Sequence, residues 1–550
     1  MSNGFLGLNI ALSGLFANQR QLGIVSHNVS NAGTKGYSRQ MMDTQAYNPY
    51  HLPGGMGSIG RGVDITPIRQ VRDEYLDYKL RFENSVKSEW ESRTEVLKQL
   101  EDIFNEPSEF GLSTRLDKFY EALRTWQENP ENLTARATLR QNIIAFSEAM
   151  RRSSNMLKDI QKDLNFQFRS AVDTVNGYAQ KIRDMNEAIH KAEIEGGRSN
   201  DLRDRRNVLV DELSNYVNVE YYEDEKKRFH VLVGGQHLVS HYRADQFKMS
   251  PRETRLNDDD SYGIYDATWS NGNEIFLRSG KLKGLKDVRD NPIGDLKGIP
   301  YYIDKLNEFA STFISEMNEV HAKGYGLDGS SGHFVFTTNG MSSAQFREHL
   351  LKKGLNGASA VETTETVLKG TENLSEKEKL AKIRENKNQI LANNPLYANK
   401  TIFQSDEKFY IVDKIKASEL SLASDLEDLN KLAAATKKEN LAGDSTNALK
   451  MIQTRHHLDM FDWGAPDDFV KSLVSNLGVD AQDAYRVTKN QELLVKEYNI
   501  NRESVMSVSL DEEIASMMKY QTAYSANARM VNVFDEMLDL LVNRLGLVGR

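Results

Sequence analysis

Residues 5–40, FLGLNIALSGLFANQRQLGIVSHNVSNAGTKGYSRQ, begin with an apolar ridge and end in a loop. The ridge places apolar side chains at alternating steps of three and four residues, which sets them on one side of a helix. Only the polar residues Gln19 and Ser26 interrupt it. We predict that the ridge pairs with another helix through Phe5, Leu8, Leu12, Leu15, Leu22 and Val29.

The other end of the chain repeats this spacing, interrupted only by Gln521 and Asp535. Each buried Leu or Val contributes about 1.5–3 kcal/mol, whereas a helix without a packing partner is marginal in water. We therefore predict that the two ends pair with each other or with neighbouring copies, and that they fray in an isolated chain. A simple intramolecular hairpin is the alternative. The predicted interface of this end is Ile514, Met517, Tyr524, Ala528, Val531, Leu538, Val542 and Leu545.

The first helix is followed by a stretch rich in Asn, Ser and Gly, residues 26–40, which indicates a helix end and a loop. Together with Ala11-Leu12-Ser13-Gly14-Leu15, this stretch resembles the N-terminal signature of the axial proteins of the bacterial flagellum. These are the rod, hook and hook-associated proteins. The ending Gly36-Tyr37-Ser38-Arg39-Gln40 is most similar to the hook-associated proteins of the hook–filament junction.

The resemblance continues in the order of the family and covers most of residues 1–340 and 400–550. The chain departs from it at Ser507, where the family usually shows Gly, and at residues 342–400, which look like an insertion. The similar segments are 111–120, 129–130, 200–206, 279–290, 508–513 and 520–529.

Composition excludes several classes of function. The 550 residues suffice for three or four cores. The formal net charge of -9 disfavours a duplex nucleic-acid ligand, because phosphate binding needs a basic surface. The absence of Cys excludes disulfides, zinc–thiolate sites and a thiol nucleophile. No apolar run approaches the roughly 20 residues of a membrane span, and no cleavable secretory signal is visible. We expect no membrane insertion.

The middle of the chain is mostly helical in its spacing. Apolar steps of three and four residues predict long helices over 71–104 and 134–194. From Val217 the period changes to two, and Gly234-Gly235 predicts a hairpin turn. Helical spacing resumes at Tyr301. Further helices are predicted over 417–432, 448–461, 467–477 and 481–498.

These patterns predict a mainly α, multi-domain fold, in which a long helical bundle carries terminal coiled-coil helices and an inserted β-rich module. The β module interrupts helical segments that return to the same bundle, so the domains are discontinuous. The predicted division is a terminal layer of 1–36 and 508–550, a bundle layer of 37–216, 283–341 and 401–507, a β module of 217–282, and a charged insertion of solvated helices over 342–400.

No catalytic, cofactor or metal site is predicted. His230, His237 and His241 lie close in sequence, but zinc needs three or four converging ligands. The acidic run Asp258–Asp260 lacks the Gly and distal Glu of a calcium loop. The glycines of residues 54–62 lack the Lys-Ser or Lys-Thr of a phosphate loop and indicate a flexible loop.

The resemblance implies a structural adaptor, not an enzyme, that forms a ring between hook and filament by axial packing of its terminal helices. It also implies four kinds of partner, namely copies of the chain, the hook protein, the next hook-associated protein and a cytoplasmic export chaperone at the C-terminal helix. Export would proceed without a cleaved signal, giving an extracellular, flagellar location. A hook or distal-rod protein, or a surface enzyme or adhesin carried on a flagellar scaffold, is the alternative. Glu512, Glu513 and Arg529 are candidates for register-setting ion pairs.

Overall fold

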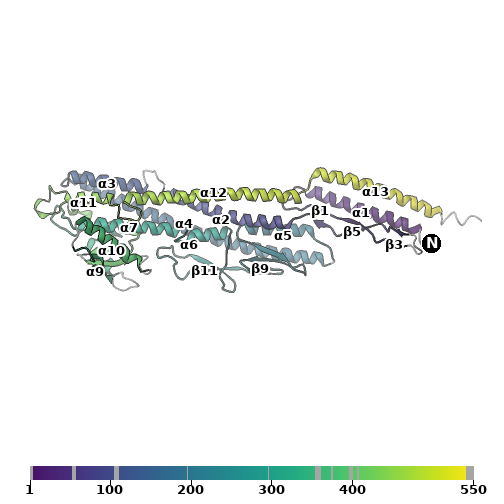
Figure 1. Ribbon diagram of the computed structural model, residues 1–550, viewed down its shortest axis with the longest axis horizontal. Helices are drawn as coiled ribbons and strands as arrows, with labels where there is room; N and C mark the ends of the chain where they lie inside the picture. Colours follow the sequence, from purple (N-terminus) through teal and green to yellow (C-terminus); the bar gives the residue numbers. More distant parts are fainter. Residues whose placement is uncertain are drawn as a thin grey trace, which may run out of the picture.

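The computed structural model describes residues 4–51, 57–104, 111–194, 196–294, 297–352, 361–372, 376–394, 400–405 and 408–540. The molecule is elongated, with the helix pair α1 and α13 at one end and a helical body along the rest of its length (Figure 1). The helices are α1 Gly4–Asn31, α2 Glu74–Phe104, α3 Leu112–Glu128, α4 Leu133–Glu193, α5 Asn200–Ser214, α6 Lys281–Asp290, α7 Ile299–Ala322, α8 Ser343–Lys352, α9 Thr364–Leu368, α10 Glu376–Ala392, α11 Thr446–Gln453, α12 Pro466–Met506 and α13 Leu510–Asp539.

The body is organised by α4, a single helix of 61 residues. The Asn132 side chain caps its first turn by accepting hydrogen bonds from the backbone N–H groups of Thr134 and Ala135. One apolar side of α4 is buried along its length, from Leu139 to Ile189, whereas Met156 and Phe166 are exposed. The sequence prediction of one long helix over 134–194 is confirmed, and so is that of the α2 helix.

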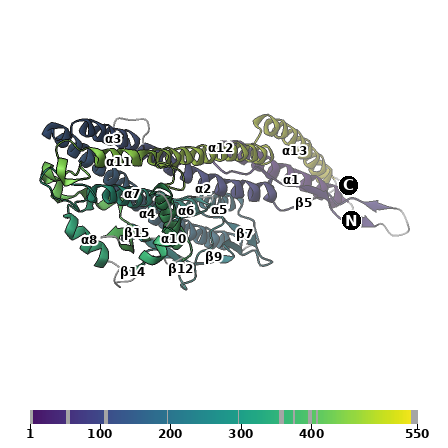
Figure 2. The same cartoon turned by 60° about the vertical axis from the view of Figure 1, so that its left-hand side comes forward.

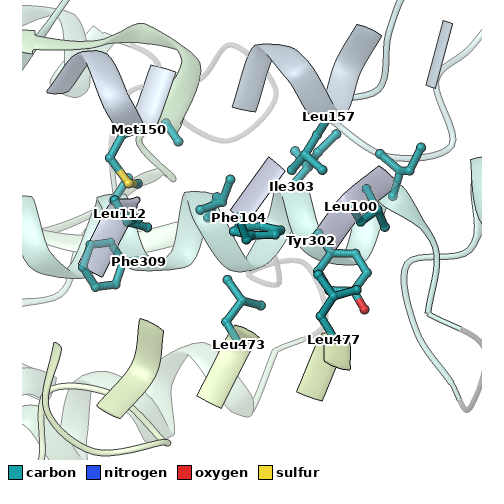
Figure 3. Packing of buried hydrophobic residues seen from close by; sticks show 14 of the residues in the cluster. Leu100, Phe104, Leu112, Met150, Leu157, Tyr302, Ile303, Phe309, Leu473 and Leu477 are labelled. Carbon is teal, nitrogen blue, oxygen red and sulfur yellow. The ribbon is translucent and has the colours of Figure 1, made fainter. Parts of the chain in front are cut away.

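The main core lies where α2, α3, α4, α7 and α12 run side by side. Figure 3 shows Leu100 and Phe104 of α2 facing Tyr302 of α7, with Leu473 and Leu477 of α12 across from them. A second group of buried rings extends this core, with centroids 5.4–6.4 Å apart, and each such ring contributes about 2–3 kcal/mol by burial. Its members are Phe119, Phe146, Phe309, Phe313 and Phe336.

The β-rich module covers one side of α4 and α5 (Figure 2). The strands β7 Glu220–Glu223, β8 Phe229–Val233, β9 Gln236–Ser240 and β10 Arg243–Ala244 form an antiparallel sheet in the order β10-β9-β8-β7. The predicted turn is confirmed, because Gly234 and Gly235 join β8 to β9 with φ of 56° and 81°. Two more strands, β11 Phe247–Pro251 and β12 Tyr265–Trp269, form a second antiparallel pair.

The predicted insertion, residues 342–400, contains α8, α9 and α10, and it shares with residues 401–413 a sheet that the sequence did not indicate. Strand β16 Lys408–Asp413 pairs with both β14 Val361–Glu362 and β15 Lys400–Ser405. Phe403 packs its ring on Phe334 of the body, at 5.8 Å between centroids. The sheet and the helices enclose a small separate core of Val367, Ile402, Phe409 and Ile411.

Two sequence predictions about the following segment are wrong. Residues 417–432 are not a helix but short 3-10 turns around β17 Leu420–Leu422, which pairs with β13 Phe336–Thr338. The buried Arg136 guanidinium of α4 donates to the carbonyls of Leu429 and Leu432, so tertiary contacts override the helical spacing. The two helices predicted over 467–477 and 481–498 are one helix, α12.

Residues 40–51 and 57–70 form the two strands of a long antiparallel ladder beside α1. The ladder consists of β1 Gln40–Met41 with β6 Arg69–Gln70, β2 Thr44–Ala46 with β5 Val63–Ile65, and β3 Tyr50–His51 with β4 Ser58–Ile59. The Ser13 hydroxyl of α1 accepts a hydrogen bond from the Val63 N–H at 3.1 Å. The middle of the ladder is thereby held along α1, while its base at Gln40 and Gln70 is hydrogen-bonded to α5 of the body. The predicted flexible loop, residues 54–62, lies partly outside the described residues.

Candidate functional site: the terminal helix pair and the neck

Helices α1 and α13 run antiparallel and contact each other at seven-residue intervals. A Cβ atom built on Gly7 would lie 2.5 Å from Cζ of Phe534, and one built on Gly14 would lie 2.9 Å from Nδ2 of Asn527. Two further repeats along, the Asn28 amide donates to a Glu513 carboxylate oxygen at 3.1 Å. The recurring glycines let the two backbones approach closely, so the two ends of the chain form one unit.

The predicted ridge is rotated away from this contact. On α1 the α13 contacts at Gly7, Gly14 and Asn28 each lie one position before a predicted ridge residue. The buried residues of α1 are Ala11, Ala17, Ile24, Val25 and Asn28. The predicted positions remain half-buried, except Ile514, which is exposed, and three whose side chains lie outside the described residues, Phe5, Val542 and Leu545. The half-buried ones are Leu8, Leu12, Leu15, Leu22, Val29, Met517, Tyr524, Ala528, Val531 and Leu538.

The helix pair leaves much apolar surface uncovered. Within Leu510–Asp539 only Glu513 is buried, although the helix has 30 residues. On α1, Phe16 is 55% exposed. Single exposed apolar residues are ordinary, but a helix with a continuous apolar side and almost no burial gains little stability from its own chain. The uncovered side chains on α13 are Leu510, Ile514, Met518, Met530, Val533, Met537 and Leu540.

Gly14→Leu is expected to wedge the helix pair apart, because the new side chain would enter the space of Asn527. Gly23→Leu is the matched control, since a Cβ at Gly23 meets no atom within 4 Å in the same helix. Hydrogen exchange of α13 amides measures the effect, and we expect at least tenfold faster exchange for Gly14→Leu than for Gly23→Leu. Equal exchange in the two variants would show that the close approach is not required.

A polar cluster, which we call the neck, joins the helix pair to the body. The Tyr37 hydroxyl donates to the Asn28 side-chain oxygen at 2.7 Å, and the Gln40 N–H donates to the same oxygen at 2.9 Å. Burial, together with nearby carboxylates, raises the pKa of Tyr37, so its hydroxyl keeps its proton. The Arg39 guanidinium bridges to α13 by donating to Glu513 at 2.7 Å and to Glu512 at 2.9 Å.

The other half of the neck is built around Asp204 of α5. Its carboxylate accepts hydrogen bonds from the Ser38 N–H at 2.9 Å, the Ser38 hydroxyl at 2.7 Å and the Gln70 amide at 2.8 Å. Arg72 pairs with it at 3.2 Å. Burial nevertheless raises the pKa of Asp204, because these donors do not fully replace the lost hydration. The loop after α1 is therefore fastened to the body by a buried carboxylate.

A second group of ion pairs, centred on Asp211, connects three body helices. Asp211 of α5 accepts from Arg81 of α2 and Arg502 of α12, both at 2.6 Å. Burial would raise the pKa of Asp211, but the charges of Arg81, Arg502 and Arg72 outweigh it and hold that pKa below its usual value. The helices that meet at the neck are thus cross-linked by charge as well as by apolar packing.

Gly36 fixes how closely the loop approaches α5. Its φ is +77°, and an added Cβ would lie 2.2 Å from Cγ2 of Val208. Both facts exclude larger side chains at this position without local strain. Each residue of the Gly36–Gln40 segment, which carries the family resemblance, therefore has a structural role. Gly36 packs on Val208, and Tyr37, Ser38, Arg39 and Gln40 make hydrogen bonds of the neck.

Three segments that the resemblance identified separately, 36–40, 200–206 and 508–513, converge on the neck. Sequence spacing could not show this, since they are more than 150 residues apart. Of the proposed ion-pair residues, Glu512 and Glu513 do pair with Arg39. No carboxylate partner of Arg529 is found among the described residues, and Arg529 is exposed.

The histidines and the acidic run considered above as metal ligands have other contacts in the part of the chain that the structure describes. His230 and His237 meet edge to face at 5.4 Å between ring centroids, but the described residues contain no group of three side chains placed to hold a metal ion. Asp259 and Asp260 have structural partners, Lys158 and Gln161. Among the same residues no helix combines the length and apolarity needed to cross a bilayer.

Comparison with known proteins finds three matching family models. The model described as the flagellar hook-associated protein FlgK helical domain matches residues 97–336. The flagella basal body rod protein model matches residues 8–37, and the flagellar basal body rod FlgEFG protein C-terminal model matches residues 505–545. The first of these two matches covers most of α1 and the loop that follows it, and the second covers all of α13.

Similar curated proteins extend over the whole chain. Flagellar hook-associated protein 1 of Bacillus subtilis (strain 168) is 27% identical, covering 100% of both chains. That of Escherichia coli (strain K12) is 23% identical over 98% of this chain and 99% of the relative. Among solved structures, the flagellar hook junction protein FlgK from Burkholderia pseudomallei has a similar fold, with a TM-score of 0.56 at 14% identity over 78% of this chain and 100% of that one.

Proposed function

We propose that the chain is a member of the flagellar hook-associated protein 1 family and the structural adaptor that joins the flagellar hook to the filament. Copies of the chain would form a ring, held by axial packing of the terminal helix pairs of neighbouring protomers. Contacts of this head-to-tail kind build tubes rather than closed dimers.

One observation carries this proposal: the terminal helix pair is fastened to the body at the neck and leaves its outer apolar side uncovered. A helix pair that only closed its own domain would bury α13, yet within Leu510–Asp539 only Glu513 is buried. The neck fixes the direction of the pair, because the Asp204 cluster and Arg39 hold it from two sides. A directed pair with an open side is suited to pack against further copies.

The match over residues 97–336 favours the junction over a hook or distal-rod role. Rod-protein models match only the two ends, which are the parts that axial proteins share. The long α4 body and its β module correspond to the hook-associated helical domain. We therefore assign the ends to axial packing and the body to the outer part of the ring.

The family suggests the neighbours of this ring. We propose the hook protein on one side, the next hook-associated protein on the other, and a cytoplasmic chaperone that covers α13 before export. Export would occur without a cleaved signal peptide, to an extracellular location on the flagellum. The uncovered apolar side of α13 supports the chaperone, because such a surface promotes aggregation before assembly.

We retain the predicted interface and domain division as part of this proposal. The half-buried positions on both helices, from Leu8 to Val29 and from Met517 to Leu538, would become buried between protomers. The terminal layer would comprise residues 1–36 and 508–550, with the bundle, β module and insertion following outward as the sequence indicates.

Labelling of this chain in purified flagella tests the proposed location. An epitope placed on the exposed turn 225–227 keeps the label away from the terminal helices. Electron microscopy is expected to show the label in a single band where hook and filament meet. Label distributed along the hook or the filament, or confined to the rod, would contradict the junction role.

A further inference from the structure

The most exposed methionines of the described residues gather on one helix, α13. Met518, Met530 and Met537 are 59%, 48% and 53% exposed. The next most exposed methionines that the structure describes, Met156 and Met41, reach only 38% and 36% and lie elsewhere in the fold. Met530 and Met537 are seven residues apart, so they lie on the same side of the helix.

The chain offers no other sulfur chemistry, because it contains 17 Met and no Cys. A two-electron oxidant such as hydrogen peroxide reacts with accessible thioethers once thiols are absent. The exposed side of α13 is therefore where such an oxidant meets this protein first.

We propose that Met518, Met530 and Met537 form an oxidation site that controls assembly of the unassembled chain, an inference that rests on the proposed function of α13. Hydrogen peroxide transfers one oxygen atom to the methionine sulfur. The O–O bond breaks, an S–O bond forms, the sulfur loses two electrons, and the peroxide leaves as water. The product, methionine sulfoxide, is polar and can be reduced back by methionine sulfoxide reductases.

Oxidation changes the interface more than it changes the isolated chain. On the exposed side of α13 each sulfoxide oxygen is hydrated, so the fold of the unassembled chain is preserved. Packing of the same side against another protomer removes that water, and an unpaired polar group in an apolar contact is costly. Each oxidised residue is expected to lower the affinity between protomers by roughly tenfold. Once assembled, the same sulfurs are covered and protected.

The test compares assembly of the full-length chain, with and without peroxide, onto hooks isolated from cells that lack this protein. The variant Met518→Leu/Met530→Leu/Met537→Leu preserves side-chain volume but cannot form sulfoxide. Met156→Leu, on α4, is the matched control. Each protein is compared with its own untreated form, and peptide mass spectrometry locates the sulfoxides.

We expect peroxide to lower hook binding at least tenfold for the wild type and for Met156→Leu, and less than twofold for the triple variant. Equal sensitivity of the triple variant and the wild type, or sulfoxide forming first at other methionines, would overturn the oxidation site. If untreated wild-type chain fails to bind hooks, the proposed function fails, and redox control of assembly fails with it. If untreated chain binds and oxidised chain binds equally well, the proposed function stands and this inference alone is wrong.

Discussion

Deletion of residues 508–550 is expected to abolish assembly onto hooks while the body of the molecule unfolds at nearly its original temperature. The deletion removes α13 at the neck, where Ser507 ends α12. Only Glu513 of the described α13 is buried, so the body loses almost no core. We expect the unfolding temperature of the body to change by less than about 3 °C, measured by circular dichroism. Binding to isolated hooks should fall below detection.

A point variant separates the loss of the interface from the loss of a segment. Val531→Asp places a charge on the half-buried apolar side of α13, whereas Asn532→Asp places the same charge one residue away at an exposed position. Hook binding is expected to decrease at least tenfold for Val531→Asp and less than twofold for Asn532→Asp, because only the first charge must be desolvated. Equal binding of both variants would show that this side of α13 does not pack in the assembly.

Asp204→Ala is expected to give the largest loss of stability among single changes at the neck. It leaves the Ser38 N–H and the Ser38 hydroxyl without their acceptor in a buried site, and the Gln70 amide keeps only the Asn200 carbonyl. Arg72 keeps Asp77 as a partner, so its charge remains paired. We expect a decrease of about 3 kcal/mol in the free energy of unfolding, measured by urea denaturation.

The matched control is Asp201→Ala, on the same helix and one turn earlier. Asp201 is 52% exposed and accepts a hydrogen bond from the Gln40 amide in water-accessible surroundings. Its loss is expected to cost less than about 1 kcal/mol. Hydrogen exchange should rise across residues 36–41 and 69–72 in Asp204→Ala but not in Asp201→Ala. An Asp204→Ala chain as stable as the control would show that the neck is held by other contacts.

The sequence predicted the parts of the fold that depend on local periodicity. The apolar steps of α4 and the Gly234–Gly235 turn are signals that no distant contact has to complete. The pairing tendency of the two ends was also predictable, since their spacing requires a partner helix.

The remaining features depend on contacts that spacing does not encode. Gly7 and Gly14 determine which side of α1 meets α13. A pattern of apolar residues does not reveal these positions, because glycine favours packing by letting the two backbones approach closely rather than by burying a side chain. The neck combines residues from three distant segments. The two helices predicted over 467–477 and 481–498 are continuous, because packing of Leu477 and Ala484 carries α12 past Gly478 at a cost of about 1 kcal/mol.

Hydrogen exchange of α13 before and after assembly tests the central claim most directly. That claim is that the outer apolar side of the terminal helix pair is covered by neighbouring protomers and not by its own chain. In the isolated full-length chain, amides of residues 514–539 are expected to exchange at least 100-fold faster than those of α4, and in assembled flagella they should become as protected as α4. Protection of α13 equal to that of α4 in the isolated chain, unchanged by assembly, would contradict the claim.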